Sequence, residues 1–177
     1  MLEMELKFRV DELSVYEEKL RGLGAEPEGP VEENNLILDM MGAPLGKMDL
    51  LFRLRNMGDR TLVTVKKPLP ATALKVRKEL EAVMECPQEK ALELFSLLGY
   101  GTVYSYRKTR NRCRLGNATV CLDSLWFGDF VEIEATSEDS VMEAAELLGL
   151  DPEEGIRFSY AALQRDAETS RRALEKS

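Results

Sequence analysis

The stretch EMELKFRV, residues 3–10, alternates apolar and charged side chains along its whole length. Successive side chains of a β-strand point to opposite faces, so this pattern predicts a strand with one apolar and one charged face. The charged face carries Glu3, Glu5, Lys7 and Arg9. Two carboxylates followed by two cations are an unusual set for one face, and the other strands must show what this face contacts.

The composition predicts one soluble globular domain. The chain has 177 residues, of which 44% are hydrophobic and 32% charged. No apolar run approaches the ~18 residues of a membrane span, and no signal-peptide pattern opens the sequence, so we expect a cytoplasmic protein without a membrane partner. The net charge of −8 argues against a nucleic-acid partner. A homodimer is expected only because dimers are common among soluble proteins.

The chain contains no histidine, and this narrows the chemistry. Histidine-based acid–base catalysis, serine–histidine–aspartate triads and histidine-ligated zinc are all excluded. The three cysteines are not spaced as metal ligands. Any bound metal must therefore be a hard cation held by carboxylates, such as Mg²⁺ or Mn²⁺.

Strand patterns recur along the chain and are separated by a few amphipathic helices. We expect strands near residues 2–10, 34–40, 50–56, 61–67, 74–85, 102–114, 118–123 and 130–135. We expect helices after Asp11 or Ser14, after Pro87, after Ser137 and over residues 159–175. The segment PEGPVEEN, residues 27–34, is typical of a turn or loop. Many strands with few helices indicate an antiparallel sheet that could close into a barrel.

Charged residues of both signs share one face on most of these strands. On a single strand this pattern is most often a solvated face. Across many strands, a wet face would also use serine, threonine and amide side chains freely, whereas here the positions are heavily charged. Such a set suits a cavity that binds a polyanion through cations and a divalent metal through carboxylates. The apolar faces would then point outward, beneath the helices.

Several motifs together resemble the CYTH superfamily, also called triphosphate tunnel metalloenzymes. Residues 3–7 match its ExExK signature, and LLFRLR, TVKKP, VRKELE, RKTR, CLDSLWFGDFVEIE and RFSYAALQ resemble its later elements in order and spacing. The resemblance covers about residues 3–164. The sequence departs from the family at Ile37 and Leu38, where an aromatic pair is usual, and at Arg157, where many members have lysine.

The resemblance implies an α+β fold, in which an eight-stranded antiparallel β-barrel closes into a tunnel and helices pack on its outside. Residues 1–177 would form a single domain, with a core at about 3–164 and a helical tail at 165–177. The tunnel would bind a small-molecule triphosphate together with Mg²⁺ or Mn²⁺.

The resemblance also implies roles for individual residues. The metal and catalytic carboxylates would be Glu3, Glu5, Glu81, Asp123, Glu132 and Glu134. The triphosphate would be bound by Lys7, Arg53, Arg55, Lys66, Arg110 and Arg157. A weaker set consists of Glu79, Arg77, Lys108 and Arg112. The three cations of this set share the inward strand parity with Arg9 and Lys75, and all five are expected at the tunnel mouth, on the surface.

Three functions fit this pattern. The first is a metal-dependent phosphohydrolase that acts on tripolyphosphate, a nucleoside triphosphate or thiamine triphosphate. The second is a class IV adenylyl cyclase, which forms cyclic AMP and pyrophosphate from ATP with the same cations and metal. The third is a noncatalytic polyphosphate-binding module, against which the many carboxylates argue.

Overall fold

The computed structural model describes residues 2–70 and 74–174, and within them eight strands close into an antiparallel barrel. Around the barrel the strands follow the order β1-β5-β4-β3-β2-β6-β7-β8. The strands are β1 Leu2–Val10, β2 Pro27–Met40, β3 Leu51–Met57, β4 Arg60–Pro68, β5 Lys75–Met84, β6 Tyr100–Leu115, β7 Ala118–Leu125 and β8 Gly128–Ala135. The α+β class and the closed eight-stranded barrel expected from the resemblance are confirmed.

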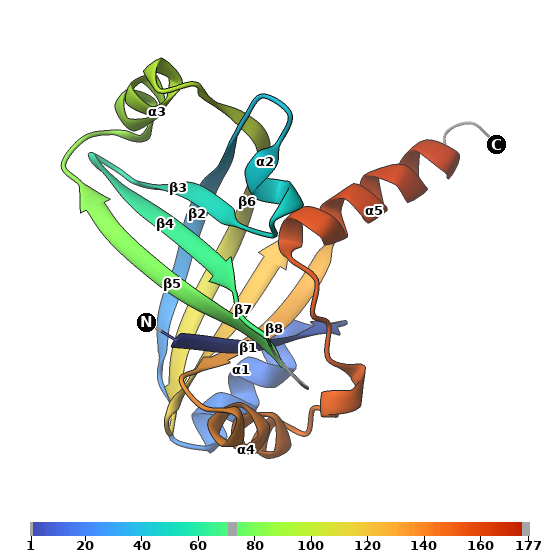
Figure 1. Ribbon diagram of the computed structural model, residues 1–177. Coiled ribbons are helices and arrows are strands. Elements are labelled where there is room, and N and C mark those ends of the chain that lie inside the picture. The colour runs from blue at the N-terminus through green and yellow to red at the C-terminus, as the bar shows by residue number, and fades with distance from the viewer. Residues whose placement is uncertain (1, 71–73, 175–177) are drawn as a thin grey trace.

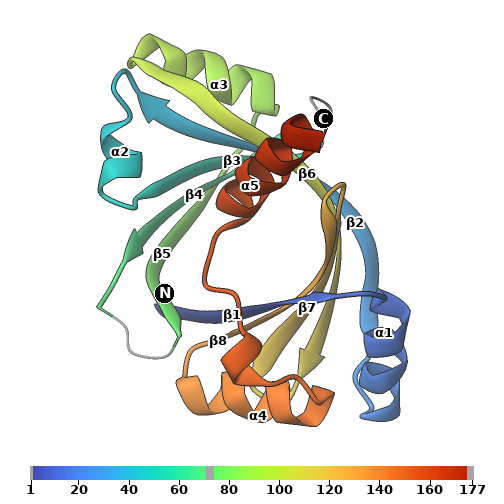
Figure 2. The same cartoon turned by 90° about the vertical axis from the view of Figure 1, so that its right-hand side faces the viewer.

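Five α-helices surround the barrel in the described part of the chain (Figure 1). They are α1 Leu13–Gly22, α2 Pro44–Lys47, α3 Gln88–Leu97, α4 Glu138–Leu148 and α5 Tyr160–Leu174, with a 3₁₀ turn at Pro152–Glu154 before α5. Figure 1 shows α1 and α4 at one end of the molecule and α3 at the other. In Figure 2, α5 overlaps the ring of strands, but Figure 1 shows that this helix begins beside the barrel and projects away from it.

The apolar faces of the strands point outward, beneath the helices. Leu6 and Ile133, on β1 and β8, are buried together with Leu20 of α1 and Val141 of α4. A second apolar cluster joins Leu38, Phe52 and Leu54 to Ala91 of α3. These two clusters contain most of the buried hydrophobic residues, so the hydrophobic driving force for folding acts chiefly outside the barrel. The interior holds polar groups and a smaller aromatic cluster that includes Tyr106 and Tyr160. The predicted inversion of the usual barrel pattern is therefore confirmed.

The prediction of a loop at residues 27–34 was wrong, because β2 already begins at Pro27 and pairs with β6 from Cys113 onward. The pairing shifts register between Pro27 and Pro30. Gly29, in this shift, has a φ of 101° and donates its N–H to Asn111 Oδ1. A β-bulge accommodates the prolines and glycine that suggested a turn.

The predicted N-cap is present in α4 but not in α1. Ser137 caps α4 and accepts a hydrogen bond from Ser140 N, as predicted. Neither Asp11 nor Ser14 caps α1, whose N-cap residue is Glu12 without a side-chain hydrogen bond. No helix among the described residues is long and apolar enough to cross a membrane.

Candidate functional site

All but two of the predicted site residues line a single cavity inside the barrel. They are Glu3, Glu5, Lys7, Arg53, Arg55, Lys66, Arg77, Glu79, Glu81, Lys108, Arg110, Arg112, Glu132 and Glu134. Strand parity places them there: on each strand the residues between them point outward to the helices. The barrel therefore gathers into one enclosed space the charges that the sequence spreads over many strands.

The carboxylates of β1 and β8 and the arginines of β3 lie on opposite walls of this cavity. In the ring of eight strands, β1 and β2 are four positions apart, as are β8 and β3. Glu3 and Glu5 on β1 and Glu134 on β8 therefore face the wall that carries Arg53 and Arg55. A ligand inside the barrel can contact carboxylates on one side and guanidinium groups on the other.

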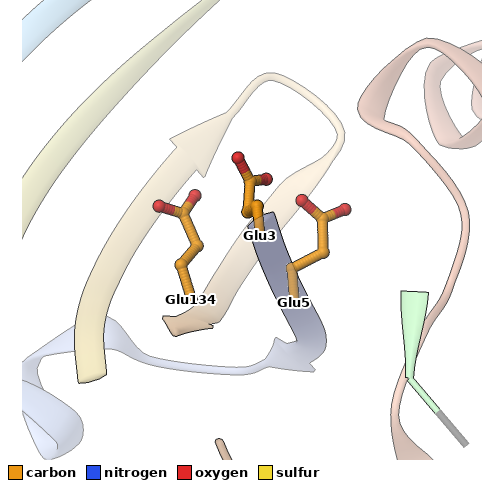
Figure 3. Close-up of side chains that lie close together, drawn as sticks. All are labelled: Glu3, Glu5 and Glu134. Carbon is orange, nitrogen blue, oxygen red and sulfur yellow. The ribbon is translucent and has the colours of Figure 1, made fainter. Parts of the chain in front are cut away.

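Three of the carboxylates form a compact group (Figure 3). One oxygen each from Glu3, Glu5 and Glu134 lies within 4.8 Å of the other two. Glu5 and Glu134 are direct cross-strand partners of the β1–β8 pair, which accounts for their approach. Oxygen ligands at this spacing suit a hard divalent cation such as Mg²⁺.

The electrostatics of this group favour the binding of a cation. Burial, a hydrogen bond with Glu79 and the nearby carboxylates raise the pKa of Glu3 to about 9, although Lys66 opposes them. Burial also raises the pKa of Glu134 to about 7, against the effect of Arg110. Burial alone would raise the pKa of Glu5, but Lys75 and Lys7 outweigh it and lower that pKa. Burial therefore disfavours the ionised forms of Glu3 and Glu134, and a bound cation would stabilise them.

Glu132 contacts two cations and lies outside the group of Glu3, Glu5 and Glu134, whose members have cation contacts of their own with Lys66, Lys75 and Arg110. Its two carboxylate oxygens contact Lys7 and Arg110. Although burial opposes ionisation, these cations hold the pKa of Glu132 well below its usual value. The structure therefore separates Glu132 from the group of Glu3, Glu5 and Glu134, and gives it the geometry of a residue that orients two cations.

Asp123 was predicted as a further metal ligand; it is fully buried on the inward face of β7, as the cross-strand partner of Arg110, and is covered by other side chains so that it does not line the cavity. Its carboxylate accepts hydrogen bonds from Arg110 Nε at 2.6 Å, from Lys108 Nζ at 2.9 Å and from the Tyr160 hydroxyl at 2.6 Å. Arg110 and Lys108 hold its pKa below the usual value in spite of burial. Asp123 thus holds two cavity cations in position, and strand parity, which places it inward, could not show that Arg110, Lys108 and Tyr160 occupy its carboxylate.

Glu79 and Glu81 line the cavity on β5, beside the cations of β3 and β4. Glu81 accepts a hydrogen bond from Thr64 at 2.8 Å and lies 3.6 Å from Arg53. Glu79 lies 3.2 Å from Lys66, which also contacts both oxygens of Glu3. Lys66 therefore links β5 to the carboxylate group on β1.

Arg157 is the second predicted site residue that does not line the cavity. It is exposed and follows Ile156, whose N–H donates to Lys7 O at 2.6 Å. This bridge directs the chain so that Ser159 and Tyr160, not Arg157, reach the cavity. Arg157 therefore lies outside this cavity, and its role in phosphate binding stays a prediction: its position depends on the segment before α5, which strand parity does not describe.

The sequence reading missed several residues of the site. Lys75 lines the cavity and contacts Glu5, although it was expected on the surface, as were the buried cavity residues Arg77 and Lys108. Glu33, in the segment read as a loop, pairs with Arg55 at 3.0 Å. Tyr106 and Tyr160 also line the cavity. The signal for Tyr106 was present, because it shares its face of β6 with Lys108 and Arg110.

Some buried side-chain donors in or beside the cavity have no hydrogen-bond partner within the described part of the protein. Among the described residues these include Arg53 Nε, Arg77 Nε and Asn35 Nδ2. A buried N–H group without an acceptor costs free energy, so such groups usually await a ligand or ordered water. Arg53 and Arg77 line the cavity, which makes an anionic ligand the natural acceptor.

Sequence comparison agrees with this geometry. The CYTH domain family matches residues 1–160. The chain belongs to the CYTH domain family. A relative from Methanocaldococcus jannaschii, provisionally named an adenylate cyclase, is 25% identical to this CYTH domain over 174 residues, which cover 93% of this chain and 99% of the relative.

Solved structures show the same fold. A protein of Pyrococcus horikoshii OT3 superimposes with a TM-score of 0.76 and 28% identity, covering 91% of this CYTH domain and 98% of that chain. A protein of Hippeastrum superimposes with a TM-score of 0.66 and 18% identity, covering 93% and 95%. The Hippeastrum protein is provisionally named an adenylyl cyclase and is described as having a dominant triphosphatase activity.

Proposed function

We propose that this CYTH domain is a metal-dependent phosphohydrolase that cleaves a triphosphate inside the barrel. One observation carries the proposal: the carboxylate group of Glu3, Glu5 and Glu134 faces a wall of buried arginines across one cavity. Phosphoryl transfer needs chiefly positioning and charge neutralisation, and these two walls provide both. The activity described for the Hippeastrum protein is of the same kind.

The residues fit a divalent cation, and Glu3, Glu5 and Glu134 would hold it. Mg²⁺ or Mn²⁺ bound there would offset charge on the phosphate oxygens and activate water for attack. Oxygen ligands are what these ions prefer, and burial is the main reason why the pKa values of Glu3 and Glu134 are raised, so that a bound cation would stabilise their ionised forms.

The cationic residues would hold and orient the phosphate chain. Arginine can donate two hydrogen bonds to one phosphoryl group, so Arg53, Arg55 and Arg110 suit the bridging and terminal oxygens. Glu132 and Asp123 keep Lys7, Lys108 and Arg110 in place. A water molecule then forms a bond to the terminal phosphorus as the bond to the bridging oxygen breaks. The water loses a proton to a cavity carboxylate, and orthophosphate and the shortened phosphate leave.

A cyclase is the second candidate, because the relative from Methanocaldococcus jannaschii carries that name. In that reaction the ribose 3′-hydroxyl would attack the α-phosphorus of ATP, and pyrophosphate would leave. The same cavity serves either reaction, and the difference lies in which phosphorus is attacked. Only the products distinguish the two.

The test is to incubate the protein separately with tripolyphosphate, ATP and thiamine triphosphate, each with Mg²⁺ or Mn²⁺. Orthophosphate and cyclic AMP are measured in the same sample, and EDTA serves as the metal-free control. We expect orthophosphate from at least one substrate and none with EDTA. Cyclic AMP without orthophosphate would establish the cyclase instead. Binding of tripolyphosphate with neither product would indicate a noncatalytic module.

Substitution of the carboxylate group tests the assignment of the metal ligands. Glu3→Gln and Glu134→Gln each keep the side-chain shape but remove one charged ligand, so both should abolish most of the turnover and weaken Mn²⁺ binding. Glu143→Gln, on the exposed face of α4, is the matched control. Full turnover and unchanged Mn²⁺ binding in both cavity variants would refute the assignment.

A further inference from the structure

Tyr106 stands out among the cavity residues because it is an uncharged donor among the cations of β3 and β6. It lies on β6 opposite Asn35 of β2, the strand that faces β1 across the barrel. It lines the cavity and is only 8% exposed. Neither the composition nor the charge pattern of the sequence assigned it a role.

The surroundings of the Tyr106 hydroxyl are cationic. Burial alone would raise its pKa, but Arg53, Lys108 and Arg55 outweigh burial and lower it. A phenol with a lowered pKa is a stronger hydrogen-bond donor. The Arg53 guanidinium can only donate, so in its hydrogen bond with Tyr106 the phenolic oxygen is the acceptor. The hydroxyl proton of Tyr106 is then available to a ligand in the cavity.

The ring of Tyr106 is held in place by its neighbours. Its centroid lies 6.0 Å from that of Tyr104 and 6.2 Å from that of Tyr160, within an aromatic cluster that also contains Phe130. Tyr160 is in turn anchored by its hydrogen bond to Asp123. The hydroxyl therefore has a fixed position, as a specific phosphate contact requires.

We propose that Tyr106 donates a hydrogen bond to the phosphoryl group farthest from the Glu3, Glu5 and Glu134 carboxylates, and so helps the site to select a triphosphate over a diphosphate. This role rests on the proposed function, because it assumes that the phosphate chain spans the two walls. A diphosphate anchored through a cation on the carboxylates has one phosphoryl group fewer to extend to the far wall. Its affinity should not depend on Tyr106.

The test compares Tyr106→Phe with Tyr104→Phe. Both remove one hydroxyl from the same aromatic cluster and keep the ring, but only Tyr106 lines the cavity. Binding is measured by calorimetric titration with Mg²⁺, using the bis-methylene analogue of tripolyphosphate and methylenediphosphonate, neither of which can be hydrolysed at the bridging position. Circular dichroism and thermal unfolding establish that both variants fold.

We expect Tyr106→Phe to weaken binding of the triphosphate analogue about tenfold, because one hydrogen bond to a charged group is lost. The affinity for the diphosphonate should change less than about twofold. Tyr104→Phe should change neither. Equal behaviour of the two variants, or an equal loss for both ligands in Tyr106→Phe, would overturn the role of Tyr106 even if hydrolysis is demonstrated. The expected pattern in a protein that releases no orthophosphate would support the subsite and refute the phosphohydrolase. A wild-type protein that binds neither analogue would refute both.

Discussion

Removal of the Asp123 carboxylate is the sharpest test of how the barrel tolerates its buried charges. Asp123 is fully buried and accepts hydrogen bonds from Arg110, Lys108 and Tyr160. Asp123→Ala would leave two buried cations without this partner. Loss of one member of a buried ion pair typically costs 3–5 kcal/mol, because the remaining charge stays desolvated.

The contacts that Arg110 and Lys108 keep in Asp123→Ala determine how much unfolding free energy we expect this variant to lose. Arg110 keeps Glu132 at 2.5 Å and Glu134 at 3.3 Å, while Lys108 keeps Glu33 at 3.6 Å and the ring of Tyr160. Partial compensation places the expected loss at the lower end of the range, at about 3 kcal/mol. Tyr160→Phe removes only one hydrogen bond to the same carboxylate and should cost about 1 kcal/mol.

Urea unfolding followed by circular dichroism measures both losses as shifts in the midpoint at constant slope. Asp166→Ala, at an exposed position on α5, is the control and should remain within about 0.5 kcal/mol of the wild type. A loss below about 1 kcal/mol for Asp123→Ala would refute the view that this carboxylate holds the cavity cations.

The pH dependence gives an independent check. The pKa of Asp123 is lowered in the folded state, so its contribution to stability is fully present above its unfolded pKa of about 3.9 and is lost as the pH falls through the folded value. The difference in unfolding free energy between the wild type and Asp123→Asn should therefore be constant near pH 7 and shrink below about pH 4. A difference that grows on acidification would contradict the sign of this shift.

Three further substitutions test separate parts of the structure. Arg53→Ala should weaken tripolyphosphate binding strongly, whereas Arg157→Ala, at an exposed position, should weaken it less in the same titration. Asp39→Ala removes the acceptor of three backbone N–H groups around α2, at Met40, Leu45 and Gly46, and should lower unfolding stability by roughly 1–3 kcal/mol. Gly58→Ala forces a φ of 79° on a residue with a Cβ in the β3–β4 turn and should cost about 1 kcal/mol in thermal unfolding.

The period of the strands is the property that the sequence determined most directly. Alternation in residues 3–10 separates Leu6 from Glu5 and Lys7 whatever the partner strand is, because side-chain direction is a local property of the backbone. The same parity predicted that the charged faces of several strands meet in one interior and that the apolar faces lie under helices. Both expectations agree with the cavity and the apolar clusters.

Which carboxylates gather into one group was decided only by the tertiary structure. Glu132 and Glu134 look equivalent in the sequence, yet Glu132 pairs with Lys7 and Arg110, while Glu134 joins Glu3 and Glu5. This division depends on cross-strand register and on the lengths of the facing cations, which bring together residues more than a hundred positions apart. The local sequence pattern does not show which residues so far apart in the chain come into contact.

Irregular backbone was the second feature that the sequence could not predict. The bulge near Gly29 turns an apparent loop into part of β2, and the segment before α5 directs Tyr160 inward and leaves Arg157 outside. In both places the conformation follows from pairing with a distant strand, β6 in one case and β1 in the other. The period of the sequence specifies which face of a strand each side chain lies on. Closure of the barrel specifies which side chains of other strands it contacts, and the chemistry proposed for this site depends on those contacts.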